Sequence, residues 1–400
     1  MKVFRHGLAS VVLLVLLAAV PAQAVSYGTS DLAGSWRGQW MEGTTGNVRY
    51  WLSITVTLDS DGDVTSGTWN SSAGLSGTIS GGSMDMDGLG SISGSMTYVG
   101  DQAGTITVHH GWMDESKDMV YMVTKKGGGQ LAAGMLCKQE NSGFSTADLE
   151  GDWSMFMQDC GLGAGDDTYW IKTDLTLNDQ GAGSGSYDFQ GVFTGSISSA
   201  SLTLGATGGI AGSMTDDFAN TIVVGAGQVN PDLSCGTMAI TKSNDRLGAG
   251  FFIWSTPTGF STADLHGTWA VYHTYVVDEN TMLWIAGYMT VDKAGNITGG
   301  EWEGPPPSDP EDPTPSGTYV GGTMAVADDG TISGDFILSN APGKTIDIEG
   351  GQMGASKTFA GIVGKWGERV DPGHVLDTVF MVKRAGAAAG LNGPLLLLLQ

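Results

Sequence analysis

Phe144-Ser-Thr-Ala-Asp-Leu-Glu-Gly-Asp-Trp153 is the stretch that decides the fold, because it returns as Phe260-Ser-Thr-Ala-Asp-Leu-His-Gly-Thr-Trp269. A looser copy, Tyr27-Gly-Thr-Ser-Asp-Leu-Ala-Gly-Ser-Trp36, lies near the beginning of the chain. The closing tryptophans are 153 − 36 = 117 and 269 − 153 = 116 residues apart. Self-similarity at a fixed period indicates a tandem array, so the chain consists of three copies of one unit.

The segment itself predicts how each unit begins. Ser145 or Thr146 can cap a short helical turn, and Asp148 stands where a capping-box acid reaches back to the free amides. Leu149 and Trp153 then enter the fold. We expect an aromatic plug at the base of a small β domain.

Residues 1–24 have the features of a secretory signal peptide: a basic start, an apolar run and the small-residue site Ala22-Gln23-Ala24. The mature protein is therefore expected in the periplasm or outside the cell. The remainder divides into spans of about 26–142, 143–258 and 259–400, each long enough to bury a core.

Charge and cysteine content narrow the class of protein. With 42 acidic and 18 basic residues the net charge is −24, which opposes binding to nucleic acid and to anionic membranes. No apolar stretch of about 20 residues follows the signal, so no transmembrane helix is expected. Cys160 and Cys235 both fall in the second unit of an exported chain, which predicts a disulfide between them and a free Cys137.

Each unit is expected to be all-β, with about eight short antiparallel strands. Residues 50–58 alternate: Tyr50, Leu52 and Ile54 share one face, and polar side chains share the other. The 64 glycines and turn signals such as Asp61-Gly62 suit short loops. A meander of eight strands closes into an up-and-down barrel without exposed edges, and a sandwich is the alternative.

One tryptophan recurs on the polar side of the second strand, as Trp51, Trp170 and Trp284. Two explanations stay open. The side chains can pack between units, or they can form a surface platform for a ligand.

The third unit is the longest. Residues 303–316 form a proline-rich and acidic loop, expected to be stiff and solvated. Residues 355–374 are interpreted as a second insertion. Residues 391–395 align with the last strand of the other units and are predicted to close the third barrel.

The pattern Leu149-Glu-Gly-Asp-Trp153, followed by Gly185-Ser-Tyr187, resembles the calycin group, meaning lipocalins and especially avidin-like barrels. The first unit has Gly67-Thr-Trp69 at the second of these places. The match covers the first three of eight strands per unit. The resemblance implies a barrel whose mouth, at one end, holds a small molecule.

No pattern in the sequence amounts to an enzyme signature. Glu301 and Glu303 flank Trp302 and could form a carboxylate pair as in glycoside hydrolysis, and His273 is the remaining candidate. Asp59-Ser-Asp-Gly-Asp63 resembles a calcium loop, but its glycine falls too early for that motif. Neither a metal nor a cofactor is expected.

The favoured hypothesis is an exported, non-catalytic binding protein whose calycin-like barrels hold a small apolar or amphipathic ligand. The alternative is a structural or glycan-binding repeat protein of the cell envelope or extracellular matrix, and an enzyme centred on the third unit is the third hypothesis. The candidate ligand-binding residues are Trp51, Trp170, Trp284, Trp69, Tyr187, Trp302 and His273.

Overall fold

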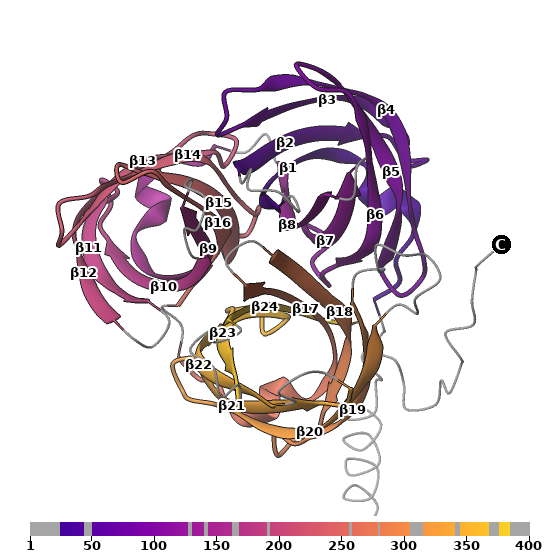
Figure 1. Cartoon of the computed structure of the whole chain (residues 1–400), viewed down its shortest axis with the longest axis vertical. Coiled ribbons are helices and arrows are strands. Elements are labelled where there is room, and N and C mark those ends of the chain that lie inside the picture. The colour runs from indigo at the N-terminus through magenta and orange to yellow at the C-terminus, as the bar shows by residue number, and fades with distance from the viewer. Residues whose placement is uncertain are drawn as a thin grey trace, which may run out of the picture.

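Three closed barrels, each of eight antiparallel strands, make up the protein (Figure 1). In each barrel consecutive strands pair and the eighth pairs with the first, so the predicted all-β, up-and-down fold class is confirmed. The computed structural model describes residues 25–43, 50–126, 130–139, 143–161, 168–189, 193–255, 258–278, 281–304, 315–340, 345–367 and 376–384. The signal peptide expected at 1–24 and most of the loop at 303–316 lie outside the described residues.

The strands of each barrel follow one another in the sequence. Barrel 1 contains β1 (Gly34–Gly43), β2 (Tyr50–Leu58), β3 (Val64–Ser71), β4 (Ser76–Met86), β5 (Ser91–Gly100), β6 (Gly104–Met113), β7 (Met119–Lys126) and β8 (Gln130–Gln139). Barrel 2 contains β9 (Gly151–Gly161), β10 (Thr168–Leu177), β11 (Ala182–Phe189), β12 (Phe193–Leu204), β13 (Ile210–Asp216), β14 (Thr221–Val229), β15 (Cys235–Lys242) and β16 (Arg246–Trp254). Barrel 3 contains β17 (Gly267–Asp278), β18 (Thr281–Val291), β19 (Ile297–Glu303), β20 (Ser316–Val326), β21 (Thr331–Leu338), β22 (Thr345–Met353), β23 (Phe359–Trp366) and β24 (Leu376–Lys383).

The repeated segment forms the base of each barrel, as predicted. In barrel 2 the 3₁₀ turn η2 (Thr146–Leu149) precedes β9, and the Ser145 amide donates to Asp148 Oδ2 at 2.8 Å. The Trp153 indole N–H donates to the Leu149 carbonyl at 2.9 Å, and both side chains are buried. The turns η1 (Thr29–Leu32) and η3 (Thr262–Leu265) repeat this arrangement.

The barrels surround a common centre, which the first, seventh and eighth strand of each barrel face (Figure 1). Rings from the three barrels meet there: Phe380 of barrel 3 lies 5.0 Å from Tyr121 of barrel 1 and 4.8 Å from Phe251 of barrel 2, between centroids. Strands such as β7, β15 and β23 are buried on both faces, because their outer faces pack against the other barrels. The three barrels therefore share one central core.

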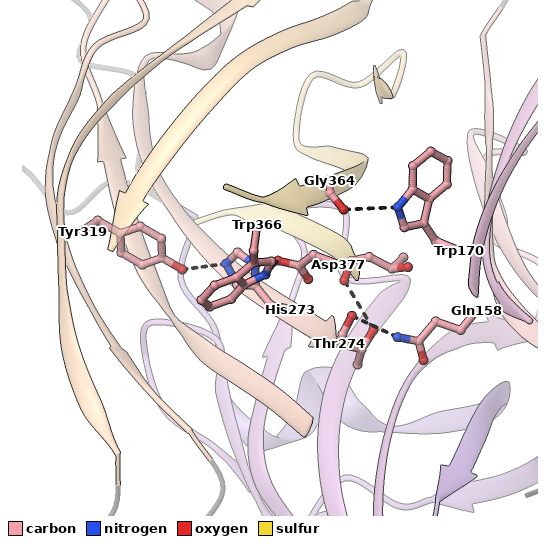
Figure 2. Close-up of polar contacts among 9 residues, drawn as sticks. Gln158, Trp170, His273, Thr274, Tyr319, Gly364, Trp366 and Asp377 are labelled. Atoms are coloured by element: carbon pink, nitrogen blue, oxygen red, sulfur yellow. Dashed lines mark hydrogen bonds and ion pairs between the residues drawn. The ribbon is translucent and has the colours of Figure 1, made fainter. Parts of the chain in front are cut away.

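The recurring outward tryptophans pack between the barrels. Trp51 of barrel 1 donates from Nε1 to Thr241 Oγ1 of barrel 2 at 3.2 Å. Trp170 of barrel 2 donates to the Gly364 carbonyl of barrel 3 at 3.1 Å (Figure 2). Each of these side chains is no more than 6% exposed.

The third tryptophan, Trp284 of barrel 3, completes the ring against barrel 1. Its ring centroid lies 6.1 Å from that of His109 and 5.6 Å from that of His110. An ion pair of 2.5 Å between His110 Nε2 and Glu303 Oε1 spans the same junction. Burial, followed by the neighbouring His110, lowers the pKa of His109, and the hydrogen bond from His110 lowers that of Glu303.

The predicted closing strand of barrel 3 is wrong. Strand β24 (Leu376–Lys383) pairs with both β17 and β23, and residues 391–395 lie outside the described residues. Residues 359–366 within the supposed insertion are the seventh strand, β23. The leucine-rich tail matched the apolar pattern of a closing strand, and this shifted the alignment.

The expected Cys160–Cys235 disulfide is also wrong, because all three cysteines are buried thiols. Strand β16 pairs with both strands concerned, placing Leu247 opposite Cys160 and Ile253 opposite Cys235. Six residues of extended strand separate the two sites by about 20 Å, far beyond the roughly 7 Å between Cα atoms that a disulfide can span. Both cysteines lie on the outer wall of barrel 2, at opposite ends of it.

Candidate ligand-binding site

Barrel 2 contains a cavity of about 270 Å³ at the end opposite Trp153. Its lining comes from the middle of β9, the last residues of β11, β13 and β15 and the first residues of β10, β12, β14 and β16. In an up-and-down barrel these strand ends meet at one rim. We call this cavity and its rim the cup.

Methionines and branched side chains form the inner wall of the cup. Met155 and Met157 come from β9, Ile171 from β10 and Met214 from β13. They point inward because side chains alternate along a strand, which also turns Phe156 outward into the central core. Flexible thioethers adapt to the shape of a bound molecule and contact aromatic rings favourably.

Aromatic rings form one side of the rim. Phe193, at the start of β12, lies 6.1 Å from Tyr187 and 5.5 Å from Phe218, between centroids. Phe193 and Phe218 are 42% and 62% exposed, although they are large and apolar. The Tyr187 hydroxyl donates to Asp217 at 3.0 Å, and partial burial together with this bond raises its pKa.

Charged residues form the other side, on the strands nearest the centre. Asp159 is fully buried, and its Oδ2 lies 2.5 Å from Lys242 Nζ. Arg246 forms a second ion pair with Asp159 through Nε, and its guanidinium lies 4.7 Å from the centre of the Tyr169 ring. One buried carboxylate therefore faces two cations, whose side chains are 11% and 17% exposed.

In barrel 1 the space equivalent to the cup is occupied by side chains. Lys126, which occupies the place of Lys242, donates to the Tyr50 hydroxyl at 3.2 Å and to Gln102 Oε1 at 3.1 Å. Its ammonium lies 4.7 Å from the centre of the Tyr98 ring, and Trp69 packs edge-on against Tyr98. A lysine and three aromatic rings thus occupy the interior.

Barrel 3 is filled by a different polar cluster (Figure 2). His273 Nδ1 lies 2.6 Å from Asp377 Oδ2, and His273 Nε2 lies 2.9 Å from the Tyr319 hydroxyl. The Trp366 indole N–H donates to Asp377 at 3.3 Å. Burial, with the charge of Asp377, raises the pKa of Tyr319 well above its usual value. His273 and Asp377 are fully buried, so His273 is a core residue.

The alignment of the copies accounts for the cavity in barrel 2. Gly94, Gly212 and Gly334 adopt the same left-handed backbone conformation on the fifth strands, with φ of 133°, 134° and 127°. Four residues later the side chains are Tyr98, Asp216 and Leu338. Four residues after the base tryptophan they are Trp40, Met157 and His273. At both positions barrel 1 has an aromatic ring that barrel 2 lacks.

Of the residues predicted from the sequence, only Tyr187 lies in the cup. Trp51, Trp170 and Trp284 are buried between barrels, which excludes them as an exposed platform. Trp69 and Trp302 are buried inside barrels 1 and 3. The carboxylates of Glu301 and Glu303 flank an inward tryptophan, and Glu303 is paired with His110.

Sequence reasoning missed the charged side of the cup. Asp159 follows Met155 and Met157 at the spacing of inward residues, so a charge at this position was a visible exception to the pattern. Its partners Lys242 and Arg246 lie more than eighty positions away, and no local pattern joins them. Within the described residues, no cluster of three or more His, Cys, Asp or Glu could hold a metal ion, and no helix is long and apolar enough to cross a membrane.

No protein-family model matches the chain, and no curated protein matches it. Solved structures give distant likenesses. A protein of unknown function from the DUF3598 family of Nostoc punctiforme is 15% identical and covers 56% of this chain and 96% of its own, with a TM-score of 0.23. A variant of transferrin-binding protein B from Haemophilus parasuis is 10% identical, and the match covers 88% of this chain and 77% of that protein, with a TM-score of 0.30. Transferrin-binding protein B from Neisseria meningitidis is 10% identical, and the match covers 88% of this chain and 76% of that protein, with a TM-score of 0.26. Because these scores are low, the likenesses carry no argument about the ligand.

Proposed function

We propose that the protein is an exported, non-catalytic binding protein in which the cup of barrel 2 holds one small apolar or amphipathic molecule. The observation that carries the proposal is the contrast between the copies: equivalent space is filled by side chains in barrels 1 and 3 and is hollow in barrel 2. Ligand sites are typically concave, mostly apolar and furnished with a few polar groups, as the cup is.

Export rests on the signal peptide expected at residues 1–24, and it places the protein in the periplasm or outside the cell. Binding through the mouth of one barrel is the mode that the calycin resemblance implies. Barrels 1 and 3 then act as the frame that fixes the inner wall of the cup, through the shared central core.

The experiment is a fluorescence titration of the full chain with N-phenylnaphthylamine, a neutral apolar probe. We expect saturable binding at one site. Replacing Met157 by Trp, the residue that barrel 1 carries at this position as Trp40, fills the cup and abolishes the signal. The control is Val223→Trp, which adds the same ring to the exposed outer wall of barrel 2 and leaves binding unchanged. A correctly folded Met157→Trp protein that binds the probe as well as the wild type would refute the proposal.

A further inference from the structure

The cup has two unlike sides, and their chemistry narrows the class of ligand. Rings lie on the side formed by β11–β13, and cations lie on the side formed by β15 and β16. A molecule that fills the space between them contacts both at once. The inference that follows rests on the proposed function.

The side of the cup formed by β15 and β16 presents two cationic groups, Lys242 and Arg246, to a ligand. Asp216 also lines the cavity, but its Oδ1 accepts from the amides of Phe218 and Asn220, and its Oδ2 accepts from the Asn220 side chain at 2.9 Å. Both oxygens of the Asp216 carboxylate are therefore hydrogen-bonded within the turn that follows β13. The second acid, Asp159, is shared by Lys242 and Arg246. Both cations line the cavity, whereas Asp159 lies behind them and is not among the lining residues.

The opposite side suits a flat ring. Tyr187, Phe193 and Phe218 form a connected row of rings, with the last two exposed. Aromatic pairs favour offset or edge-on contacts, and the sulfur atoms of Met155 and Met214 below can contact the edge of an added ring.

We propose that the ligand is a small aromatic acid: a flat ring system inserted against the aromatic side, with a carboxylate or a similar anionic group beside Lys242 and Arg246. The volume of about 270 Å³ lies just below the range of about 300–1,000 Å³ typical of sites for drug-sized molecules. A ligand of two or three fused rings therefore fills the cup and reaches its rim.

Two probes that differ in the anionic group test the class. Anilinonaphthalene sulfonate and N-phenylnaphthylamine share their rings, and only the first carries a sulfonate. We expect the sulfonate to bind the wild-type chain about tenfold more tightly, the size of one charge-assisted hydrogen bond. Decanoate, an anion without a ring, should displace neither probe at equal concentration.

Variants locate the effect while Asp159 keeps one of its two cationic partners. Lys242→Met leaves Arg246 paired with Asp159, and it should weaken the sulfonate about tenfold while leaving the neutral probe unchanged. Lys242→Arg should restore the preference. Lys126→Met, the same change at the equivalent position of barrel 1, is the matched control and should alter neither affinity.

The outcomes separate the two proposals. If neither probe binds, the proposed function fails. If both bind equally, or if decanoate competes as well as the aromatic anion, the cup binds ligands but the aromatic-acid class is wrong. These comparisons use the wild-type chain, so they remain decisive even if a variant fails to fold.

Discussion

Trp51, Trp170 and Trp284 each lie at a junction between two barrels, which we call a seam, and together they provide a test of the barrel arrangement within one chain. Trp170 and Trp284 occupy equivalent positions and are 1% and 2% exposed. The indole N–H of Trp170 donates to the Gly364 carbonyl, whereas that of Trp284 has no acceptor among the described residues. Replacement by Phe removes the same atoms from both seams, so the two variants differ in the fate of one hydrogen bond.

The magnitudes follow from that difference. Loss of part of the ring costs about 1–2 kcal/mol in either variant. Trp170→Phe also leaves the Gly364 carbonyl buried without this donor, which adds about 1–3 kcal/mol. Trp284→Phe instead removes a buried unpaired donor and regains a similar amount. We expect a loss of about 3 kcal/mol for Trp170→Phe and a change near zero for Trp284→Phe.

Urea unfolding of the full chain, followed by far-ultraviolet circular dichroism, measures both values. This signal does not depend on tryptophan fluorescence, which the substitutions alter. Trp51→Phe is the control, because Trp51 also donates across a seam and should behave as Trp170 does. Equal losses in Trp170→Phe and Trp284→Phe would refute the assigned seam contacts.

Three further predictions concern the turns, the core and the seams. Burial raises the pKa of Asp114 to about 7. The contribution of Asp114 to stability is therefore complete below about pH 4 and is lost as the pH rises through 7. Asp114→Asn introduces the residue that barrel 2 has as Asn230, and it should remove this pH dependence of the unfolding free energy, measured by urea titration at several pH values. Asp377→Leu leaves His273 buried without its carboxylate and should cost about 3–5 kcal/mol. The double variant with His273→Phe should recover only part of the loss in a denaturation cycle, because Trp366 and the Tyr319 hydroxyl also lose these partners. A methyl group at Gly225 would lie 2.5 Å from the ring of Trp51. Gly225→Ala should therefore destabilise the protein by about 1–3 kcal/mol in thermal unfolding. An unchanged unfolding midpoint would contradict the packing between barrels 1 and 2.

Sequence reasoning reached the fold because its signals are local. The repeated segment ending at Trp153 predicts the base, and the alternation in residues 50–58 predicts an inner and an outer face. The outward Trp51 was recognised as an exception to that alternation. Its partner lies in another copy, and no pattern within one copy identifies it.

The cup was beyond sequence reasoning for a different reason. Whether a barrel is hollow depends on the summed volume of side chains from eight strands, and single positions do not reveal it. The difference between Tyr98 and Asp216 can be interpreted only after the fifth strands are aligned in register. The disulfide prediction failed similarly, because membership of one unit says nothing about which end of the wall Cys160 and Cys235 occupy.

The ring of seams also fixes the copy number of the unit. Each barrel presents one tryptophan to the next and receives one from the last, so three barrels saturate one another. A fourth copy of the unit would have no barrel face left to pack against. Deletion of one barrel would expose the apolar outer faces of the other two to water. Gain or loss of a whole unit should therefore destabilise the protein, whereas the interior of a barrel can differ without changing the contacts between barrels, as the three unlike interiors illustrate.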